Sequence, residues 1–354
     1  MASSGRELSS AQDGPDGSTA GAAAPARSPY PASFYRDPAG TARSDLAPRE
    51  LAEIVRSGVG EVWVDIDCRD RHQHALLEKV FGFHPLAVED TLNPLSRVKI
   101  EEYDGYLFVI IRGVRLDEHT DDPYDLETVN LNFFLGANYL VTVHDGPSRV
   151  IAAVTEQMRR APELLSRGAE RLMHAIMDTT IDMFFPVVEQ VDEFTQAIEE
   201  RVFVHADSNA LHDIFSVKRL VLQMRRYLGP QREIFNILSN RPTPLLRLES
   251  QIYFRDIYDH VLRINEALET YRDLLTSVLD AYLTQVSNRL NVATKGLTVV
   301  ATLSIPFVVV SGMWGMNFAR IPLASAPYGF WWMVGAQLVI GLVLLGVLRW
   351  RRWV

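Results

Sequence analysis

Two long uncharged runs near the C-terminal end of the sequence constrain the fold most strongly. Leu297–Trp314 is a run of 18 residues without a charged side chain, and Ala326–Leu348 is a second such run of 23 residues. About 20 apolar residues in a helix that rises ~1.5 Å per residue cross a bilayer core of roughly 30 Å. Buried helices of a soluble core seldom run this long without one charge. The two runs therefore predict a transmembrane hairpin with residues 315–325 as its loop.

Basic residues at the two ends of this hairpin predict its orientation. Arg289 and Lys295 precede the first run, Arg349, Arg351 and Arg352 follow the second, and the loop contributes only Arg320. Because positively charged flanks stay in the cytoplasm, we expect both ends of the hairpin there, including a short basic tail at 349–354. The sequence thus predicts a multi-pass protein of the cell (inner) membrane with cytoplasmic N- and C-termini.

One hairpin cannot enclose a path for a polar solute, so a transporting chain of this kind needs several copies around an axis. The first run is the better lining for that axis, because it and its approach carry polar and small residues, whereas the second run is rich in Gly, Val and Leu. Steps of three and four along a helix place one set of residues on one face. The predicted pore-lining residues are Asn291, Thr294, Leu297, Thr298, Ile305, Val308 and Gly312.

A short motif follows the first run. A ring of Asn317 side chains at the outer mouth would offer carbonyl oxygens without fixed charge, which suits Mg²⁺ because that ion sheds its hydration shell reluctantly. The string Ser311-Gly-Met-Trp-Gly-Met-Asn-Phe318 resembles the signature of the CorA-type divalent-cation transporters. These proteins have two membrane spans and a Gly-Met-Asn motif at the end of the first. The resemblance implies that Gly315, Met316 and Asn317 form a selectivity filter.

Other strings extend this resemblance to roughly residues 50 to 354. They are His84–Asp90, Arg97–Tyr103 and Leu107–Ile111. The resemblance implies a pentameric funnel that admits Mg²⁺, and Co²⁺ and Ni²⁺ as well, down the electrochemical gradient. It also implies regulatory Mg²⁺ sites between subunits, formed by Asp90 with Asp256 and by Glu89 with Asp178. The electrostatics agree with this expectation, because facing carboxylates repel one another unless a divalent ion screens them.

Two departures from the family pattern leave alternatives open. Thr294 and Ile305 stand where some members have methionine. The stretch 318–327 lacks the acidic residues that often follow the motif and has Arg320 instead, so less cation would be concentrated at the mouth. A transporter of Zn²⁺ or another divalent cation, of the ZntB type, is therefore an alternative, and a membrane-tethered metal sensor that does not transport is a second one.

The residues before the hairpin predict an α/β cytoplasmic domain followed by long helices. Residues 1–45 have few large apolar side chains and predict a disordered tail. Residues 46–147 alternate strand and helix patterns, and 148–248 are mostly helical. A heptad seam then runs through one helix predicted over 249–314, which continues into the membrane. The seam consists of Ile257, Val261, Ile264, Leu268, Tyr271, Leu275, Val278 and Tyr282.

Composition excludes several other classes of protein. The formal net charge of -9 disfavours a nucleic-acid partner and suits cations. The single cysteine, Cys68, supports neither an internal disulfide nor a thiolate-rich metal site. No apolar segment follows Met1, so we expect no cleavable signal peptide. No catalytic constellation and no nucleotide-binding motif appear, and the membrane potential can drive the ion, so we expect neither an enzyme nor a nucleotide requirement.

Overall fold

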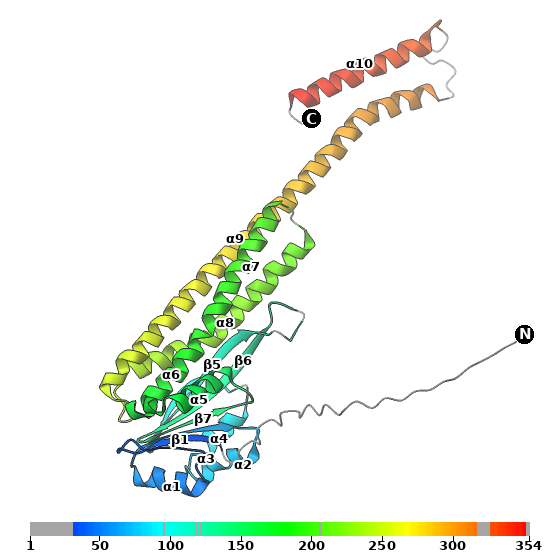
Figure 1. Ribbon diagram of the computed structural model, residues 1–354. Coiled ribbons are helices and arrows are strands. Elements are labelled where there is room, and N and C mark those ends of the chain that lie inside the picture. Colours follow the sequence, from blue (N-terminus) through cyan, green and yellow to red (C-terminus); the bar gives the residue numbers. More distant parts are fainter. Residues whose placement is uncertain are drawn as a thin grey trace, which may run out of the picture.

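The computed structural model describes residues 31–94, 96–117, 119–120, 122–204, 207–316 and 326–351. Figure 1 shows three parts that follow one another along the molecule: an α/β domain, a stalk of long helices and a helical hairpin. This is the predicted fold class, and the order of its parts also agrees with the sequence analysis. The stalk lies between the domain and the hairpin, so one helix connects the two directly.

A mixed sheet of seven strands forms the centre of the α/β domain. The strand order is β2-β1-β3-β7-β6-β5-β4, and β3 and β7 are the parallel pair. The strands are β1 (Ala32–Arg36), β2 (Ala42–Ser44), β3 (Glu61–Asp67), β4 (Lys99–Tyr103), β5 (Tyr106–Leu116), β6 (Leu126–Gly136) and β7 (Tyr139–His144). Since side chains alternate along a strand, Val62 and Val64 enter one core while Trp63 enters the other.

Helices cover both faces of the sheet. The Val62 face packs against the short helices α1 (Pro48–Ser57), α2 (Arg71–His74), α3 (Leu76–Lys79) and α4 (Pro85–Leu92). The Trp63 face packs against α5 (Arg149–Arg160), the 3₁₀ helix η1 (Pro162–Arg167) and α6 (Ala169–Asp182). Both faces are therefore buried, as the near-continuous apolar runs of β5 and β7 require.

The prediction of a disordered tail over residues 1–45 is wrong at its C-terminal end. β1 and β2 lie within this range, and β1 pairs with β3 from Ala32 opposite Asp65 to Arg36 opposite Glu61. Phe34 is only 6% exposed and stacks on Trp63 with ring centroids 5.4 Å apart. A composition averaged over 45 residues conceals the buried Phe34 ring, whose apolar surface helps to hold β1 against β3. Residues 1–30 lie outside the described part of the chain.

The stalk consists of α7 (Phe184–Val204), α8 (Ser208–Asn240) and α9 (Leu248–Trp314). α9 has 67 residues, which corresponds to roughly 100 Å at 1.5 Å per residue. The predicted heptad seam faces α7 and α8: seven of its eight residues are buried, and Tyr271 is partly buried. The seam prediction is thus confirmed, because each of its positions meets a neighbouring helix.

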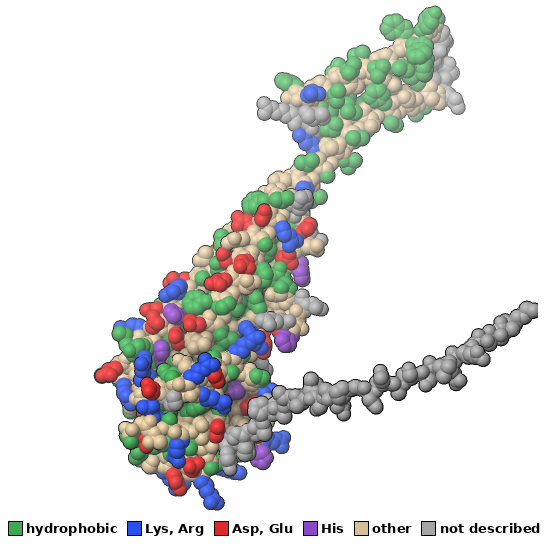
Figure 2. All heavy atoms as spheres, viewed as in Figure 1, with side chains coloured by type: hydrophobic (Ala, Val, Ile, Leu, Met, Phe, Trp, Pro, Cys, Tyr) green, Lys and Arg blue, Asp and Glu red, His purple; other side chains and the backbone are tan. Residues whose placement is uncertain are grey.

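The hairpin consists of the last third of α9 and of α10 (Gly329–Trp350), which runs back beside it. Both helices are long and apolar enough to cross a membrane. Of the most apolar 18-residue stretch, 0% is buried within the chain in α9 and 6% in α10. Figure 2 shows hydrophobic side chains over the hairpin, with Lys and Arg side chains at the end nearest the stalk. A soluble core would bury such helices, so this exposure favours a lipid environment.

Candidate pore and acidic metal centre

α9 ends at the Gly-Met-Asn motif. Trp314 is its last residue, and Gly315 caps it with an N–H that donates to the Ser311 carbonyl at 3.1 Å. Met316 continues the turn and is 52% exposed. Gly315 has a φ of −82°, and a Cβ there would meet only ordinary contacts at 3.5 Å or more. The conformation of one chain therefore does not require glycine at 315. Asn317, the third predicted filter residue, lies outside the described residues.

The predicted pore-lining residues lie on one side of α9. Phe307 marks the side that faces α10, because a Cβ on Gly341 of α10 would lie 2.8 Å from its ring. At ~100° per residue, Asn291, Thr294, Thr298, Ile305 and Gly312 lie at least about 140° around the helix from Phe307. Val308 lies about 100° away and Leu297 about 80°, so Leu297 is at the flank. All seven residues are exposed in the single chain.

Thr298 is placed to offer an acceptor on this face. Its hydroxyl donates to the Thr294 carbonyl of the preceding turn at 2.8 Å. The bond fixes the hydroxyl hydrogen inside the helix and leaves the oxygen lone pairs directed outward. Such an oxygen can accept a hydrogen bond from water around a cation. This face of α9 therefore combines acceptors, small residues and two apolar positions, Ile305 and Val308.

A polar contact joins the two helices of the hairpin on the other side of α9. Gln337 of α10 is 9% exposed, and its Nε2 donates to the Ser311 hydroxyl at 3.2 Å. One turn further along α10, Gly341 allows close approach of the Phe307 ring. Small residues and interhelical hydrogen bonds are the usual means of helix packing within a bilayer. The sequence analysis did not single out Gln337, although a lone amide in an apolar run was an available indication.

A second cluster lies where α6 packs against α9. His260 Nδ1 lies 3.5 Å from Asp182 Oδ1 and 3.9 Å from Asp178 Oδ1, and His260 Nε2 lies 4.0 Å from Asp256 Oδ2. One candidate ligand atom from each of Asp178, Asp182 and His260 falls within 4.8 Å of the others. These separations are too long for hydrogen bonds. Adjacent ligand atoms held about 2.1 Å from a six-coordinate ion would lie roughly 3 Å apart. A small movement of these three side chains toward one another would therefore let them bind a divalent metal.

The electrostatics of this cluster also fit a cation. Asp178 Oδ1 and His260 Nδ1 are buried atoms without a hydrogen-bond partner. Burial raises the pKa of Asp178, the charges of Asp182 and Asp256 raise it further, and His260 opposes them. Carboxylates suit Mg²⁺, whereas an imidazole nitrogen favours transition metals such as Co²⁺, Ni²⁺ and Zn²⁺. The two orphaned atoms and the excess of negative charge are thus what a bound divalent ion would satisfy.

Asp90, at the end of α4, has a cationic partner of its own. Its Oδ2 lies 2.6 Å from Lys99 Nζ, and Lys99 also contacts Glu101 at 2.8 Å. The preceding residue, Glu89, is exposed. α4 and the first turns of α9 lie at separate places on the body (Figure 1), so one chain does not bring Asp90 to Asp256. The pairings of Asp90 with Asp256 and of Glu89 with Asp178 were predicted between subunits, and they remain predictions.

Comparison with known proteins decides the family. The sequence profile described as CorA-like Mg²⁺ transporter protein matches residues 60–350, which is most of the chain. The chain belongs to the CorA family. The predicted resemblance is thereby confirmed, and the chain is a divalent-cation transporter of that family with two candidate membrane helices at its C-terminal end.

Individual relatives agree with this assignment. The chain is 34% identical over 297 residues to YfjQ of Bacillus subtilis, an alignment that covers 83% of this chain and 91% of YfjQ. It is 28% identical to the cobalt/magnesium transport protein CorA of Thermotoga maritima, over 82% of this chain and 83% of that protein. The structure of the CorA magnesium transporter of Methanocaldococcus jannaschii superposes with a TM-score of 0.78 at 21% identity, covering 91% of this chain and 98% of the other.

Asp182 and His260 complete the acidic centre in this CorA-family chain, and the sequence analysis missed both. His260 follows Asp256 by four residues, so the two lie on the same face of α9. Asp182 follows Asp178 by four residues on α6 in the same way. The spacing alone indicates a shared helix face, but only the packing of α6 against α9 shows that the two faces meet.

Proposed function

We propose that the chain is one subunit of a homo-oligomeric channel, a pentamer by family resemblance, which admits Mg²⁺ through a pore lined by α9. The observation that carries this proposal is the exposed face of α9 opposite α10. It offers the Asn291 amide just before the span and the Thr298 hydroxyl within it, on the same face as the apolar Ile305 and Val308. Since α10 covers the other side, copies arranged with α10 outside would turn this face to a common axis.

Exposed apolar residues between the stalk and the hairpin support assembly. Leu283, Leu290 and Val292 are 55%, 63% and 72% exposed. They lie on α9 beyond Tyr282, the last buried residue of the seam. Leu283 and Leu290, seven residues apart, lie on the same side of α9, and exposed apolar surface of this kind is usually covered by a partner. The occupant that fits best is the same segment of a second copy, because Leu283 and Leu290 lie one heptad apart and repeat on the same side of α9.

The proposed substrate follows from the acceptors on this path. Asn317 would close the outer end of the pore with amide oxygens, and Thr298 would contact a hydrated ion further in. A path without fixed negative charge suits Mg²⁺ that keeps much of its water, and it accepts Co²⁺ and Ni²⁺ of similar hydration. An inside-negative potential contributes roughly 2.3 kcal/mol per charge per 100 mV, and twice that for a divalent ion, so no nucleotide is needed.

Gating is assigned to the acidic centre. Mg²⁺ or Co²⁺ held by Asp178, Asp182 and His260, with Asp256 beside them, would neutralise the repulsion that raises the pKa of Asp178. Asp90 and Glu89 of a neighbouring subunit would join the same ion or a second one. Loss of the ion would restore the repulsion at the base of α9. Because α9 continues into the span, a movement there would reach the pore.

The test is Mg²⁺ uptake into liposomes that contain the purified protein and an internal Mg²⁺-sensitive dye. We expect uptake by the wild type, loss of uptake in Asn317→Ala, and normal uptake in Leu338→Ala, a matched control at an exposed position of α10. Equal reconstitution of the three proteins is verified by gel. Absence of Mg²⁺ uptake at every internal Mg²⁺ concentration would contradict the Mg²⁺ assignment. Zn²⁺ flux in the same liposomes would then indicate a zinc transporter, and absence of all flux a sensor.

A further inference from the structure

A polar cavity of about 540 Å³ lies at the carboxyl ends of the parallel strands β3 and β7. β7 pairs with β6 only from Leu131 to Leu135, so β6 runs on past the end of β7. The chain crosses there from the sheet into α5, which opens a space between the α4 side and the α5 side. In open α/β sheets, ligands bind in the crevice beyond the carboxyl ends of the strands. The pore and the acidic centre use none of the residues that line this cavity.

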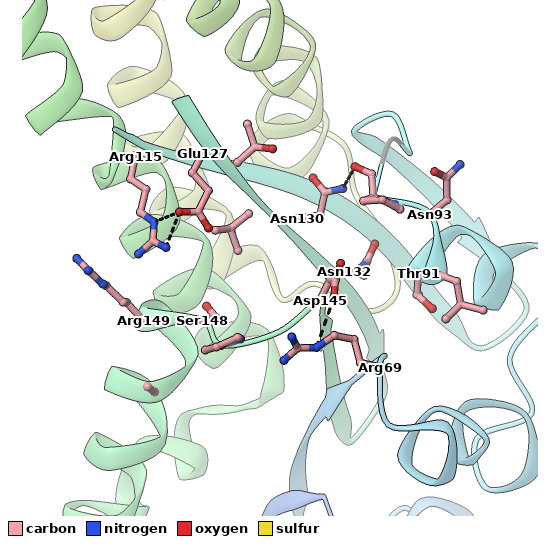
Figure 3. Close-up of a pocket in the computed structure, with 16 residues that line it drawn as sticks. Arg69, Thr91, Asn93, Arg115, Glu127, Asn130, Asn132, Asp145, Ser148 and Arg149 are labelled. Atoms are coloured by element: carbon pink, nitrogen blue, oxygen red, sulfur yellow. Dashed lines mark hydrogen bonds and ion pairs between the residues drawn. The ribbon is translucent and has the colours of Figure 1, made fainter. Parts of the chain in front are cut away.

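Three arginines line the cavity, Arg69 from the turn after β3, Arg115 from β5 and Arg149 from α5, together with the carboxylates of Glu127 and Asp145 (Figure 3). Arg115 contacts Glu127 through Nε and Nη2, and Arg69 binds both oxygens of Asp67 through the same two nitrogens. These contacts hold each guanidinium group in one orientation and leave further N–H groups of its fork for another acceptor. The third, Arg149, is exposed at the first position of α5. Arginine forks held in this way are suited to phosphate.

The N-terminal end of α5 faces the same cavity. Ser148 caps this helix of 12 residues by accepting the Ile151 N–H with its hydroxyl at 3.3 Å. The first N–H groups of a helix have no acceptor within it, and the helix dipole favours an anion at that end. Ser148, Arg149 and Ala152 all line the cavity. A phosphate group between this end and the arginines would have donors on two sides.

A buried side chain with an unused acceptor gives a second, independent indication of a ligand. Asn132 of β6 is 3% exposed, and its Nδ2 donates to the Val143 carbonyl at 3.1 Å. That bond fixes the orientation of the amide, and its Oδ1 has no hydrogen-bond partner. Asn132 lies among the residues that line the cavity, between Asp145 and Thr91 (Figure 3). A buried acceptor left without a donor is costly, so the cavity calls for a hydroxyl or amino group at this point.

We propose that this cavity binds a small phosphate ester that also carries hydroxyl groups. The phosphate would lie between Arg115, Arg149 and the start of α5, and a hydroxyl would donate to Asn132 Oδ1. The volume falls within the range of about 300–1,000 Å³ that is usual for small-molecule sites. Neither proposed metal site contributes a residue to this cavity. The phosphate ester would therefore bind without contact to the transported ion.

The test is calorimetric titration of the full-length protein in detergent at constant free Mg²⁺, with inorganic phosphate, ribose, ribose 5-phosphate and AMP as probes. We expect ribose 5-phosphate or AMP to bind at least tenfold more tightly than phosphate, and ribose alone not to bind. Arg149→Ala, at an exposed position, should weaken binding of the ester at least tenfold. Arg160→Ala, at the other end of α5, is the matched control and should leave it unchanged.

Asn132→Leu separates the two halves of the site. It should weaken binding of the ester about tenfold and leave the affinity for inorganic phosphate unchanged. A melting temperature equal to that of the wild type shows that Asn132→Leu is folded. If this variant is not folded, the affinity of Arg149→Ala for the ester tests the proposal. Absence of binding by phosphate, ribose 5-phosphate and AMP at millimolar concentration would overturn the proposal. Equal binding by the Arg149→Ala and Arg160→Ala variants would also overturn it.

Discussion

The body, which comprises the α/β domain and the stalk, and the C-terminal helical hairpin differ in how far one chain buries their apolar side chains. In the body, Trp63 and Phe254 are fully buried, and both faces of the sheet are covered by helices of the same chain. In the hairpin, Val308 and Leu342 are 69% and 67% exposed, although they are equally apolar. Hydrophobic burial within the chain therefore accounts for the body. The exposed apolar surface of the hairpin favours contact with lipid and, under the proposed function, with further copies of the chain that complete the transport path.

The largest difference in stability should lie along α9 itself. Leu268, in the seam, is fully buried, whereas Leu283, four turns on, is 55% exposed. Leu268→Ala should lower the free energy of unfolding of the body by about 2–5 kcal/mol, because it leaves a cavity. Leu283→Ala should change it by no more than about 0.5 kcal/mol. Chemical unfolding of the full chain in detergent, followed by circular dichroism, measures the free energy of unfolding of both variants. Equal effects of the two substitutions would contradict the difference between the buried seam and the exposed segment.

Metal binding should stabilise the body through Asp178. With a divalent ion at about 100 times its dissociation constant, the wild type should gain about 2.7 kcal/mol, seen as a higher melting temperature. Asp178→Asn should lose this gain. Asp259→Asn, at an exposed position of α9 next to His260, is the control and should keep it.

Without metal, the effect of Asp178→Asn should reverse. The pKa of Asp178 is raised, so the folded state holds its proton more tightly than the unfolded state does. The ionised carboxylate therefore destabilises the fold increasingly as pH rises from the ordinary value of 3.8 through the raised one. At pH 7 in EDTA, the variant should melt above the wild type. A lower melting temperature there would show that Asp178 stabilises the body without any ion.

A smaller effect is expected where α10 meets α9. A Cβ at Gly341 would lie 2.8 Å from the Phe307 ring, whereas one at Gly346 meets nothing within 4 Å. Gly341→Ala should therefore destabilise the assembled protein by about 1–3 kcal/mol relative to Gly346→Ala, since both share the same gain in helix propensity. Size-exclusion chromatography of heated samples would show this destabilisation as loss of the oligomer at a lower temperature. Identical behaviour of the two variants would contradict the packing of this hairpin.

The smallest effect concerns a buried histidine in the body. The two ring nitrogens of His144 face acceptors, Asp65 Oδ2 at 3.0 Å and the Gly146 carbonyl. Burial lowers the pKa of His144, but the bonds to Asp65 and Gly146 raise it more, and the net shift is upward. The stabilisation of the fold by the protonated His144 ring is therefore complete below the ordinary pKa of 6.5. It is lost as pH rises through the raised pKa of the folded state.

Replacing this histidine tests that sign. The difference in melting temperature between wild type and His144→Gln should be larger at pH 5.5 than at pH 8.5. His72→Gln, at an exposed position, serves as the control for substitution of a histidine. A difference that grows toward alkaline pH would contradict the assignment of a protonated His144.

Local patterns in the sequence predicted the parts of the fold that depend on periodicity. The seam from Ile257 to Tyr282 repeats within one helix, so its burial followed from spacing alone. The uncharged runs that form the hairpin are equally local, and they coincide with the end of α9 and with α10. The order of β1 and β2 did not follow, because it depends on pairing with β3 and on contacts such as that of Phe34 with Trp63, which lies 29 positions further along the chain.

The candidate site was predictable only in part for the same physical reason. The face that carries Thr298 and Ile305 follows from helical spacing. The joining of Asp182 to His260 depends on how α6 lies against α9, and the contact of Gln337 with Ser311 depends on the register of the hairpin. These are tertiary facts, which spacing along a single helix does not contain.

The most direct test of the central claim is the accessibility of single cysteines along α9. Cys68 is replaced by alanine; it is buried, and burial together with Asp145 and Asp67 raises the pKa of its thiol to about 11, so its background reactivity is low. Cysteines are placed at Thr298, Ile305 and Gly312 on the proposed pore face, and at Leu303 and Phe307 toward α10. A membrane-impermeant cationic thiol reagent is then added outside liposomes whose interior contains EDTA.

We expect the reagent to modify the cysteines at 298, 305 and 312 and to stop Mg²⁺ uptake, while those at 303 and 307 remain unmodified and uptake continues. Modification of 303 and 307 with protection of the other three would contradict it, because the water-filled path would then run on the α10 side of α9.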